Sequence, residues 1–377
     1  MIIEKISARK MKDSRGKDTI EVSINGISAS SPSGTSAGKY EAKSFHKDVF
    51  WNVKAINNFK ELKEINLESF ADLHLVEDLI MKKFNLKKAN QFGANALFAL
   101  ESAILKAIAK EKKKELWQII NENAKRMPVP LGNVLGGGLH TKNNDSPTFQ
   151  EFLIVPKGKS IKENFEIMKR VHNKLGKLTK SKTKGQEGEW ETPLNEEQIL
   201  KILSKFKDVR IGLDVAASTF YKNKEYHYKN KTLDKKAQIK YINYIIEDFN
   251  PIYVEDPLDE EDFAGFSKIS KKTLVSGDDL TVSNLERVKK AYKMKSINCM
   301  ILKPNQTGSL IEINEVVKFC KHHGIKTVFS HRAGETLDNA LADYAFGFQS
   351  DFIKCGISTK WREVKLKRLI DIAKSIR

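Results

Sequence analysis

The sequence has few cysteines and no long apolar run. Three cysteines, Cys299, Cys320 and Cys355, occur among 377 residues, an odd number without CxxC spacing. Neither a disulfide framework nor a zinc cluster is therefore indicated. No stretch approaches the roughly 18 apolar residues that a membrane span needs. Glu4 and Lys5 stand where a signal peptide has its apolar core, so we expect a cytoplasmic protein without a membrane span.

Basic residues outnumber acidic ones. Lysine and arginine total 66 against 48 aspartates and glutamates, which gives a formal net charge of +18. A strongly basic surface attracts polyanions, so binding to nucleic acid has to be considered. The basic residues are scattered along the chain, however, and no nucleic-acid-binding motif accompanies them. Solvated lysine side chains are the simpler interpretation, and nucleic-acid binding stays open.

Length and composition indicate a globular protein of two domains, with 40% apolar and 30% charged residues. Residues 19–24 alternate between apolar and polar as in a strand, and apolar residues recur at helical spacing over residues 93–111. The pair Pro128 and Pro130 ends this part, because proline cannot continue a helix. We predict an N-terminal α+β domain over residues 1–126 and a second domain over residues 127–377.

The second domain contains a repeated strand–helix pattern. Six short apolar runs each end in a polar residue and are followed by a helical segment; they cover residues 209–214, 251–255, 273–278, 299–303, 327–331 and 351–354. From Glu255 to Lys354 the terminal polar residues recur every 23 to 28 positions, the length of one strand, one helix and two loops. No glycine-rich dinucleotide fingerprint follows any run. The pattern predicts parallel strands closed into a (β/α)8-type barrel.

Polar residues at the carboxyl ends of barrel strands face one another, which is where such barrels carry their active sites. Here these positions hold Asp214, Glu255, Asp278, Lys303, His331 and Lys354. Three neighbouring carboxylates favour a divalent cation, and ligation by oxygen alone favours magnesium over zinc. A lysine beside a cation has a lowered pKa, so Lys303 is a candidate general base. The alternative is a buried ion network of carboxylates and lysines.

Motifs in both halves resemble those of the enolase family. The N-terminal ones are Ala8-Arg9, Asp13-Ser14-Arg15-Gly16, Pro32-Ser33-Gly34-Thr35-Ser36-Ala37-Gly38-Lys39-Tyr40-Glu41 and Gly93-Ala94-Asn95-Ala96. The later ones are Gln150-Glu151-Phe152, Gly212-Leu213-Asp214, Glu255-Asp256-Pro257, Asp278-Asp279-Leu280-Thr281, Lys303-Pro304-Asn305-Gln306 and Ser330-His331-Arg332-Ala333-Gly334-Glu335-Thr336. Their order and spacing make the chain similar to a shortened, divergent, archaeal-like member.

The resemblance implies the reversible dehydration of 2-phospho-D-glycerate to phosphoenolpyruvate in glycolysis, with two magnesium ions and a homodimer. It implies that Asp214, Glu255 and Asp278 bind the first ion. Ser36, on a lid loop, would bind the second ion once substrate is present. Lys303 would take the C2 proton, and Glu187 would protonate the leaving hydroxyl with Glu151 as its partner. The substrate-binding residues would be His140, Gln150, Glu151, Ser330, His331, Arg332 and Lys354.

Two stretches depart from the family pattern. The family's D-E-G-G-F-A-P corresponds here to Gln186-Glu187-Gly188-Glu189-Trp190-Glu191-Thr192-Pro193, which surrounds the expected acid with two more carboxylates and a tryptophan. Ala333 stands where the family usually has serine. An enolase-like protein with weakened catalysis, binding nucleic acid or other anions through its basic surface, is therefore the alternative to an active enolase.

Overall fold

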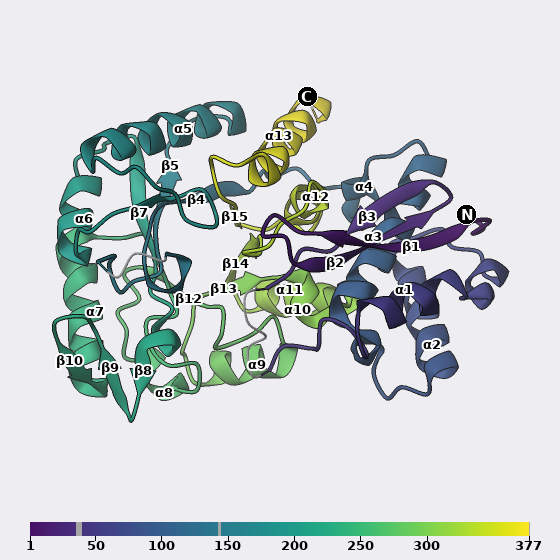
Figure 1. Cartoon of the computed structure of the whole chain (residues 1–377), viewed down its shortest axis with the longest axis horizontal. Helices are drawn as coiled ribbons and strands as arrows, with labels where there is room; N and C mark the ends of the chain where they lie inside the picture. The colour runs from purple at the N-terminus through teal and green to yellow at the C-terminus, as the bar shows by residue number, and fades with distance from the viewer. Residues whose placement is uncertain (35–39, 142–144, 377) are drawn as a thin grey trace.

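The computed structural model describes residues 1–34, 40–141 and 145–376, which form an N-terminal sheet with helices beside a barrel (Figure 1). The N-terminal elements are β1 (Ile6–Lys12), β2 (Asp18–Ile24), β3 (Ile27–Ser30), α1 (Val49–Asn57), α2 (Leu73–Phe84), α3 (Ala94–Glu111) and α4 (Leu116–Asn121). The strands form an antiparallel sheet in the order β1-β2-β3. Helix α3, apolar on nearly every side, is almost wholly buried against this sheet, as its composition predicts.

The second part is a closed eight-stranded barrel within the described residues, so the predicted barrel is confirmed. Its strands are β4 (Val129–Gly136), β5 (Glu151–Pro156), β7 (Val209–Asp214), β11 (Tyr253–Glu255), β12 (Leu274–Gly277), β13 (Cys299–Leu302), β14 (Lys326–Ser330) and β15 (Phe352–Lys354). Strand β15 pairs with β4 and closes the ring. The last six correspond to the six apolar runs predicted as strands, and each lies parallel to its neighbours in that series.

Helices cover the outside of the barrel. They are α5 (Ile161–Leu178), α6 (Glu196–Leu203), α7 (Lys235–Phe249), α8 (Phe263–Phe266), α9 (Leu285–Lys293), α10 (Pro304–Thr307), α11 (Leu310–His322), α12 (Ala340–Gly347) and α13 (Lys360–Ser375). Four short strands lie outside the ring: β6 (Trp190–Glu191), β8 (Tyr221–Lys222), β9 (Glu225–His227) and β10 (Thr232–Asp234). None of the helices in the described ranges is long and apolar enough to cross a membrane.

One barrel strand runs against the others. Strand β5 is antiparallel to both β4 and β7, so the barrel differs from the all-parallel repeat that the sequence pattern predicts. Its first residue, Glu151, pairs with the last residue of β7, Asp214. The reversal therefore brings the beginning of β5 to the same edge as the carboxyl ends of the other strands, and Glu151 reaches the site from there.

The barrel interior below this edge is filled by side chains. Leu131, Leu153, Val155, Tyr253, Cys299, Ile301 and Val328 form a small separate cluster inside the strands. This packed layer is the floor of the site above it. All three cysteines are buried and free.

The N-terminal part docks onto the carboxyl edge of the barrel through loops. Ser33 and Gly334 exchange backbone hydrogen bonds of 2.7 and 3.0 Å, and the Ser14 N–H donates to the Glu335 carbonyl at 2.8 Å. A Cβ at Gly334 would lie 1.9 Å from Asp13 Oδ2, so only glycine allows this approach. The N-terminal part therefore forms one wall of the opening above the barrel. Residues 35–39, which include Ser36 and most of the predicted lid loop, lie outside the described residues.

Candidate active site

A cavity of about 120 Å³ lies at the carboxyl edge of the barrel, as the strand-end residues predict. Eleven of the thirteen predicted site residues line it: His140, Gln150, Glu151, Glu187, Asp214, Asp278, Lys303, Ser330, His331, Arg332 and Lys354. Glu255 lies just beneath, fully buried, and bonds to Lys354. Ser36 is outside the described residues. Side chains separated by up to about 200 positions in the sequence thus share one cavity.

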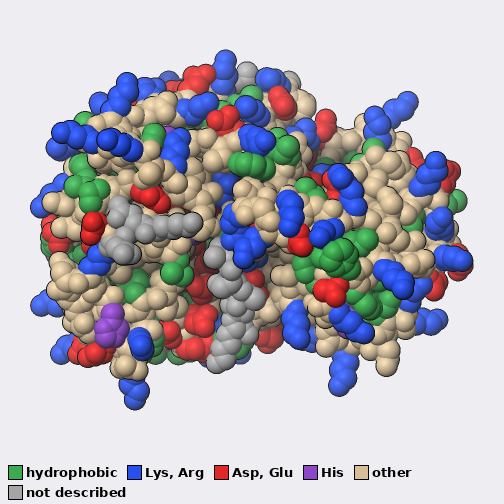
Figure 2. Space-filling view, viewed as in Figure 1, with side chains coloured by type: hydrophobic (Ala, Val, Ile, Leu, Met, Phe, Trp, Pro, Cys, Tyr) green, Lys and Arg blue, Asp and Glu red, His purple; other side chains and the backbone are tan. Residues whose placement is uncertain are grey.

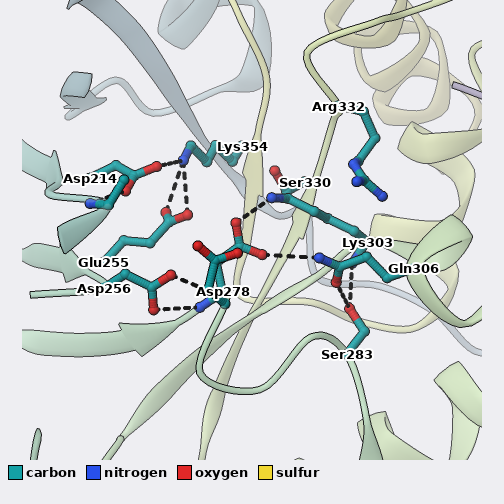
Figure 3. A network of polar contacts seen from close by, with 12 residues as sticks. Asp214, Glu255, Asp256, Asp278, Ser283, Lys303, Gln306, Ser330, Arg332 and Lys354 are labelled. Atoms are coloured by element: carbon teal, nitrogen blue, oxygen red, sulfur yellow. Dashed lines mark hydrogen bonds and ion pairs between the residues drawn. The ribbon is translucent and has the colours of Figure 1, made fainter. Parts of the chain in front are cut away.

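Lys354 lies among three carboxylates. Its Nζ is 2.8 Å from Asp214 Oδ2 and 2.9 and 3.1 Å from the two Glu255 oxygens (Figure 3). The same Nζ is 3.2 Å from Glu151 Oε2. The lysine is 3% exposed. Burial alone would lower its pKa, but the Asp214, Glu151 and Glu255 carboxylates outweigh burial and raise the pKa of Lys354 well above its ordinary value. Lys354 is therefore charged.

Lys303 forms the second cluster with Asp278. Its ammonium bonds to Asp278 Oδ2, and Gln306 Nε2 donates to the other Asp278 oxygen at 3.3 Å (Figure 3). Burial would lower the pKa of Lys303, but the Asp278 carboxylate outweighs it, so the pKa of Lys303 is raised. The lowered pKa predicted for Lys303 concerns the site with a cation bound beside it and stays a prediction, whereas the carboxylate of Asp278 decides the pKa in the arrangement described here.

Carboxylates are in excess over cations around these two lysines. Asp256 accepts the backbone N–H groups of Asp278 and Asp279 at 3.0 and 2.7 Å. Oxygens of Asp256, Asp278 and Asp279 lie within 4.8 Å of one another. Burial and the Asp214 carboxylate raise the pKa of Glu255 to about 8, while burial and the Asp278 carboxylate raise that of Asp279 to about 7. An all-oxygen cluster with surplus negative charge fits a hard divalent cation such as magnesium.

A third group gathers around Glu187, on the turn before β6. Donor and acceptor atoms of His140, Glu151 and Glu187 lie within 4.8 Å of one another, and His331 Nε2 is 3.3 Å from Glu187 Oε2. Burial, together with the Glu187 and Asp214 carboxylates, raises the pKa of Glu151 well above its ordinary value despite the opposing charge of Lys354. Burial also lowers the pKa of His331. Burial would raise the pKa of Glu187, but His331 and His140 outweigh it and hold the pKa of Glu187 well below its ordinary value.

Arg332 marks the side of the cavity next to the N-terminal part. Its Nη1 donates to Asn305 Oδ1 at 3.0 Å, and its Nη2 lies 3.0 Å from Glu41 Oε2. A guanidinium in this setting can bind an anionic group with two parallel hydrogen bonds. The fully buried Arg362, on α13, donates to the Ala333 carbonyl at 3.0 Å and supports the same loop from behind.

Several cavity residues were not among the predicted ones. Glu41, Ala216, Thr219, Asp256 and Asp279 also line the cavity. Three of them, Glu41, Asp256 and Asp279, lie inside motifs that the sequence analysis quotes, next to predicted residues. A position next to a predicted site residue in the same motif was therefore the sequence feature that could have indicated them. It does not indicate which of the adjacent side chains point into the cavity.

Two family models together match nearly the whole chain. The model described as "Enolase, N-terminal domain" matches residues 3–120, and "Enolase, C-terminal TIM barrel domain" matches residues 124–376. The chain belongs to the enolase family. Relatives named "Enolase" agree over nearly the full length. The one from Methanocorpusculum labreanum is 37% identical over 98% of this chain and 98% of its own length. The one from Archaeoglobus fulgidus is 34% identical over 99% of this chain and 97% of its own length. The relative from Thermoplasma acidophilum is 34% identical over 98% of each chain.

As an enolase, the chain is a phosphopyruvate hydratase, a lyase of glycolysis. The family match confirms the predicted family, fold class and enzyme class. The alternative of a weakened, anion-binding relative gains no support. On the face shown in Figure 2, Lys and Arg side chains are spread over both parts of the molecule instead of forming one stripe.

Proposed function

We propose that this enolase dehydrates 2-phospho-D-glycerate to phosphoenolpyruvate with Lys303 as the base and Glu187, supported by Glu151, as the acid. The observation that carries this assignment is their placement across the barrel. Lys303 follows β13 and Glu151 begins β5, and these strands are four positions apart in the eight-strand ring. A proton can thus leave C2 toward one wall while the C3 hydroxyl leaves toward the other.

Removal of the C2 proton falls to Lys303. Its Nζ lies in the cavity wall on a strand end, where it can approach a carbon held between β13 and β5. To accept a proton it must first lose its own, which the ion pair with Asp278 opposes. A divalent cation bound by Asp214, Glu255 and Asp278 would draw the Asp278 charge away from Lys303 and would stabilise the negative charge that develops on the substrate carboxylate.

Departure of the C3 hydroxyl requires a proton donor. Glu151, whose pKa is raised by burial and by the Glu187 carboxylate, holds a proton within the buried group that it forms with Glu187 and His331 on the far wall. Ligand atoms of Glu151, Glu187 and His140 lie within 4.8 Å of one another, so a proton on Glu151 can reach Glu187 within this group. The carboxyl pair therefore acts as the acid, with Glu187 facing the leaving oxygen.

The anionic groups of the substrate are matched by the remaining cavity residues. We assign Lys354 to the carboxylate side and Arg332 to the phosphate, where its fork suits two oxygens. His140, Gln150, Ser330 and His331 complete the substrate-binding set. Ser36 as a ligand of a second magnesium ion remains a prediction, since it lies outside the described residues.

We also propose a homodimer and a domain boundary between residues 126 and 127. Strand β1 is at the edge of its sheet among the described residues, and the side chain of Arg9 on it is 71% exposed, so this side chain is accessible to a second copy. The boundary falls between α4 and β4. Sedimentation analysis of the purified chain tests the dimer directly.

Two variants test the assignment of base and acid. Lys303→Ala is expected to lower kcat for phosphoenolpyruvate formation by at least about 1,000-fold, and Glu187→Gln by about 100-fold or more. Exchange of the C2 proton in deuterium oxide separates the two steps: Glu187→Gln should retain exchange, while Lys303→Ala should lose it. The exposed Lys240, on α7, supplies the control Lys240→Ala. Exchange that persists in Lys303→Ala would refute the base assignment.

A further inference from the structure

The turn that carries Glu187 is held by backbone hydrogen bonds. The Gly185 N–H donates to the Glu189 carbonyl at 3.0 Å, and the Gly188 N–H donates to the Gly185 carbonyl at 3.1 Å. An isolated bridge between Lys184 and Trp190 closes the base of the turn. Glu187 sits at the tip, 3% exposed. Its carboxyl can therefore reach the cavity only from the direction that this turn sets.

Glu189 fills the inside of the same turn. Its side chain is fully buried, and its Oε2 accepts the backbone N–H of Glu187 at 2.8 Å. The other oxygen, Oε1, is buried without a hydrogen-bond partner among the described residues. Glu189 does not line the cavity. Its contact with the site is thus through the peptide group of Glu187.

The surrounding backbone leaves room for this side chain. A Cβ at Gly136, on β4, would lie 2.6 Å from Glu189 Cγ, and a Cβ at Gly185 would lie 1.9 Å from Glu189 Oε1. Any larger residue at either position would push the carboxyl out of the turn. The buried carboxyl is therefore accommodated by two glycines from different segments.

The outside of the turn is fixed to α5. The Trp190 ring stacks on His172 with centroids 5.3 Å apart, and its Nε1 donates to the His172 carbonyl at 2.9 Å. The His172 ring in turn bonds to the Gly188 carbonyl at 2.8 Å. Trp190 anchors the base of the turn and His172 holds the Gly188 carbonyl from outside, whereas Glu189 holds the Glu187 N–H from inside.

The neutral form of the Glu189 carboxyl is favoured by its surroundings. Burial, and then the charge of Glu187, raise the pKa of Glu189 to about 8, while backbone hydrogen bonds of the turn and then Arg362 oppose the shift. A neutral side chain next to Glu187 avoids the repulsion that two carboxylates would experience. Glutamine, which is neutral, equally long and able to accept the same N–H, is therefore its closest substitute.

We propose that Glu189 is a positioning residue for Glu187: it holds the Glu187 peptide N–H from inside the turn and fixes where the Glu187 carboxyl enters the cavity. The proposal rests on the proposed function of Glu187 as the acid. In the family motif that this stretch resembles, a glycine stands at the corresponding place, so the N–H would lack this side-chain acceptor.

The test compares Glu189→Gln with Glu189→Met, which keeps the length but removes the acceptor. Displacement of a reacting group by about 1 Å costs on the order of 100-fold in rate, so Glu189→Met should lower kcat by about that factor. Because Glu189 does not touch the cavity, KM should stay within about 3-fold of wild type in both variants. Glu189→Gln should restore kcat to within about 3-fold of wild type.

Gly185→Ala provides a second variant with Glu189 intact, and it should reproduce the loss of kcat by displacing the Glu189 carboxyl. Circular dichroism and thermal melts establish that each variant is folded. Wild-type kcat in folded Glu189→Met or Gly185→Ala would overturn the proposal, as would equal losses in Glu189→Gln and Glu189→Met. Wild-type kcat in Glu187→Gln would instead refute the acid assignment itself, so the two failures are distinguishable.

Discussion

Lys354 compensates the charge of the buried carboxylates, and the effect of its removal on the melting temperature can be calculated. Lys354→Ala leaves Asp214, Glu255 and Glu151 without their ammonium partner in a site that is nearly inaccessible to water. Breaking a buried ion pair by deleting one partner costs about 3–5 kcal/mol. With an unfolding entropy of about 2.1 cal/mol/K per residue, a chain of 377 residues should melt about 4–6 °C lower in chelator.

Magnesium and pH should both modify that loss. A cation that binds the same carboxylates contributes about 2.7 kcal/mol at 100 times its Kd, and the variant has more uncompensated charge to attract it. Added magnesium should therefore raise the melting temperature of Lys354→Ala more than that of wild type. The loss should also be smaller at pH 6 than at pH 8, because the raised pKa values of Glu255 and Glu151 let these two carboxylates take up protons more readily at the lower pH.

The assay is differential scanning calorimetry in chelator and in magnesium, with the exposed Lys240→Ala as the matched control. A melting temperature of Lys354→Ala in chelator equal to that of the control would refute the reasoning. An equal rise in melting temperature on adding magnesium in Lys354→Ala and wild type would refute the prediction that the variant binds the cation more strongly.

Two further predictions follow from single contacts. The Tyr253 hydroxyl donates to Glu255 Oε2 at 2.6 Å, so Tyr253→Phe should weaken magnesium binding about 10-fold by titration calorimetry, and an unchanged Kd would contradict this. The pKa of Glu189 is raised from 4.5 to about 8, so its contribution to stability is complete below pH 4.5 and is lost as the pH rises to about 8. In urea titrations, the free energy of unfolding of Glu189→Gln should therefore rise relative to that of wild type by up to about 1.4 kcal/mol per pH unit between pH 5 and pH 8. A difference between the two proteins that stays constant with pH would contradict the raised pKa.

Much of the barrel could be read from the sequence because each strand–helix unit carries its own local signal. The apolar runs from Val209 to Lys354 mark strands buried on both faces, and the polar residues that end them meet at one edge in any such barrel. Strand β5 was not among the six predicted runs, and its apolar pattern looks the same in either direction. Only its pairing with β4 and β7 decides the direction.

The charge states of the site residues were less predictable from the sequence than the identity of these residues. The pKa of Lys303 depends on the carboxylate that lies against it, and Asp278 comes from another strand 25 positions earlier. Likewise, the sequence shows Glu189 two residues from Glu187, but not that its side chain turns inward beneath Gly136 and Gly185. Burial and long-range neighbours set both properties.

The sequence by itself determined the barrel, the rim of polar strand ends and the family, because periodicity and motif order are properties of the chain. The tertiary structure decided which carboxylates share Lys354, where β5 places Glu151, and how the turn of Glu187 is filled. Electrostatic interactions and desolvation depend on distances in space, and those distances are set only when the strands close into a ring and the N-terminal part docks on its edge.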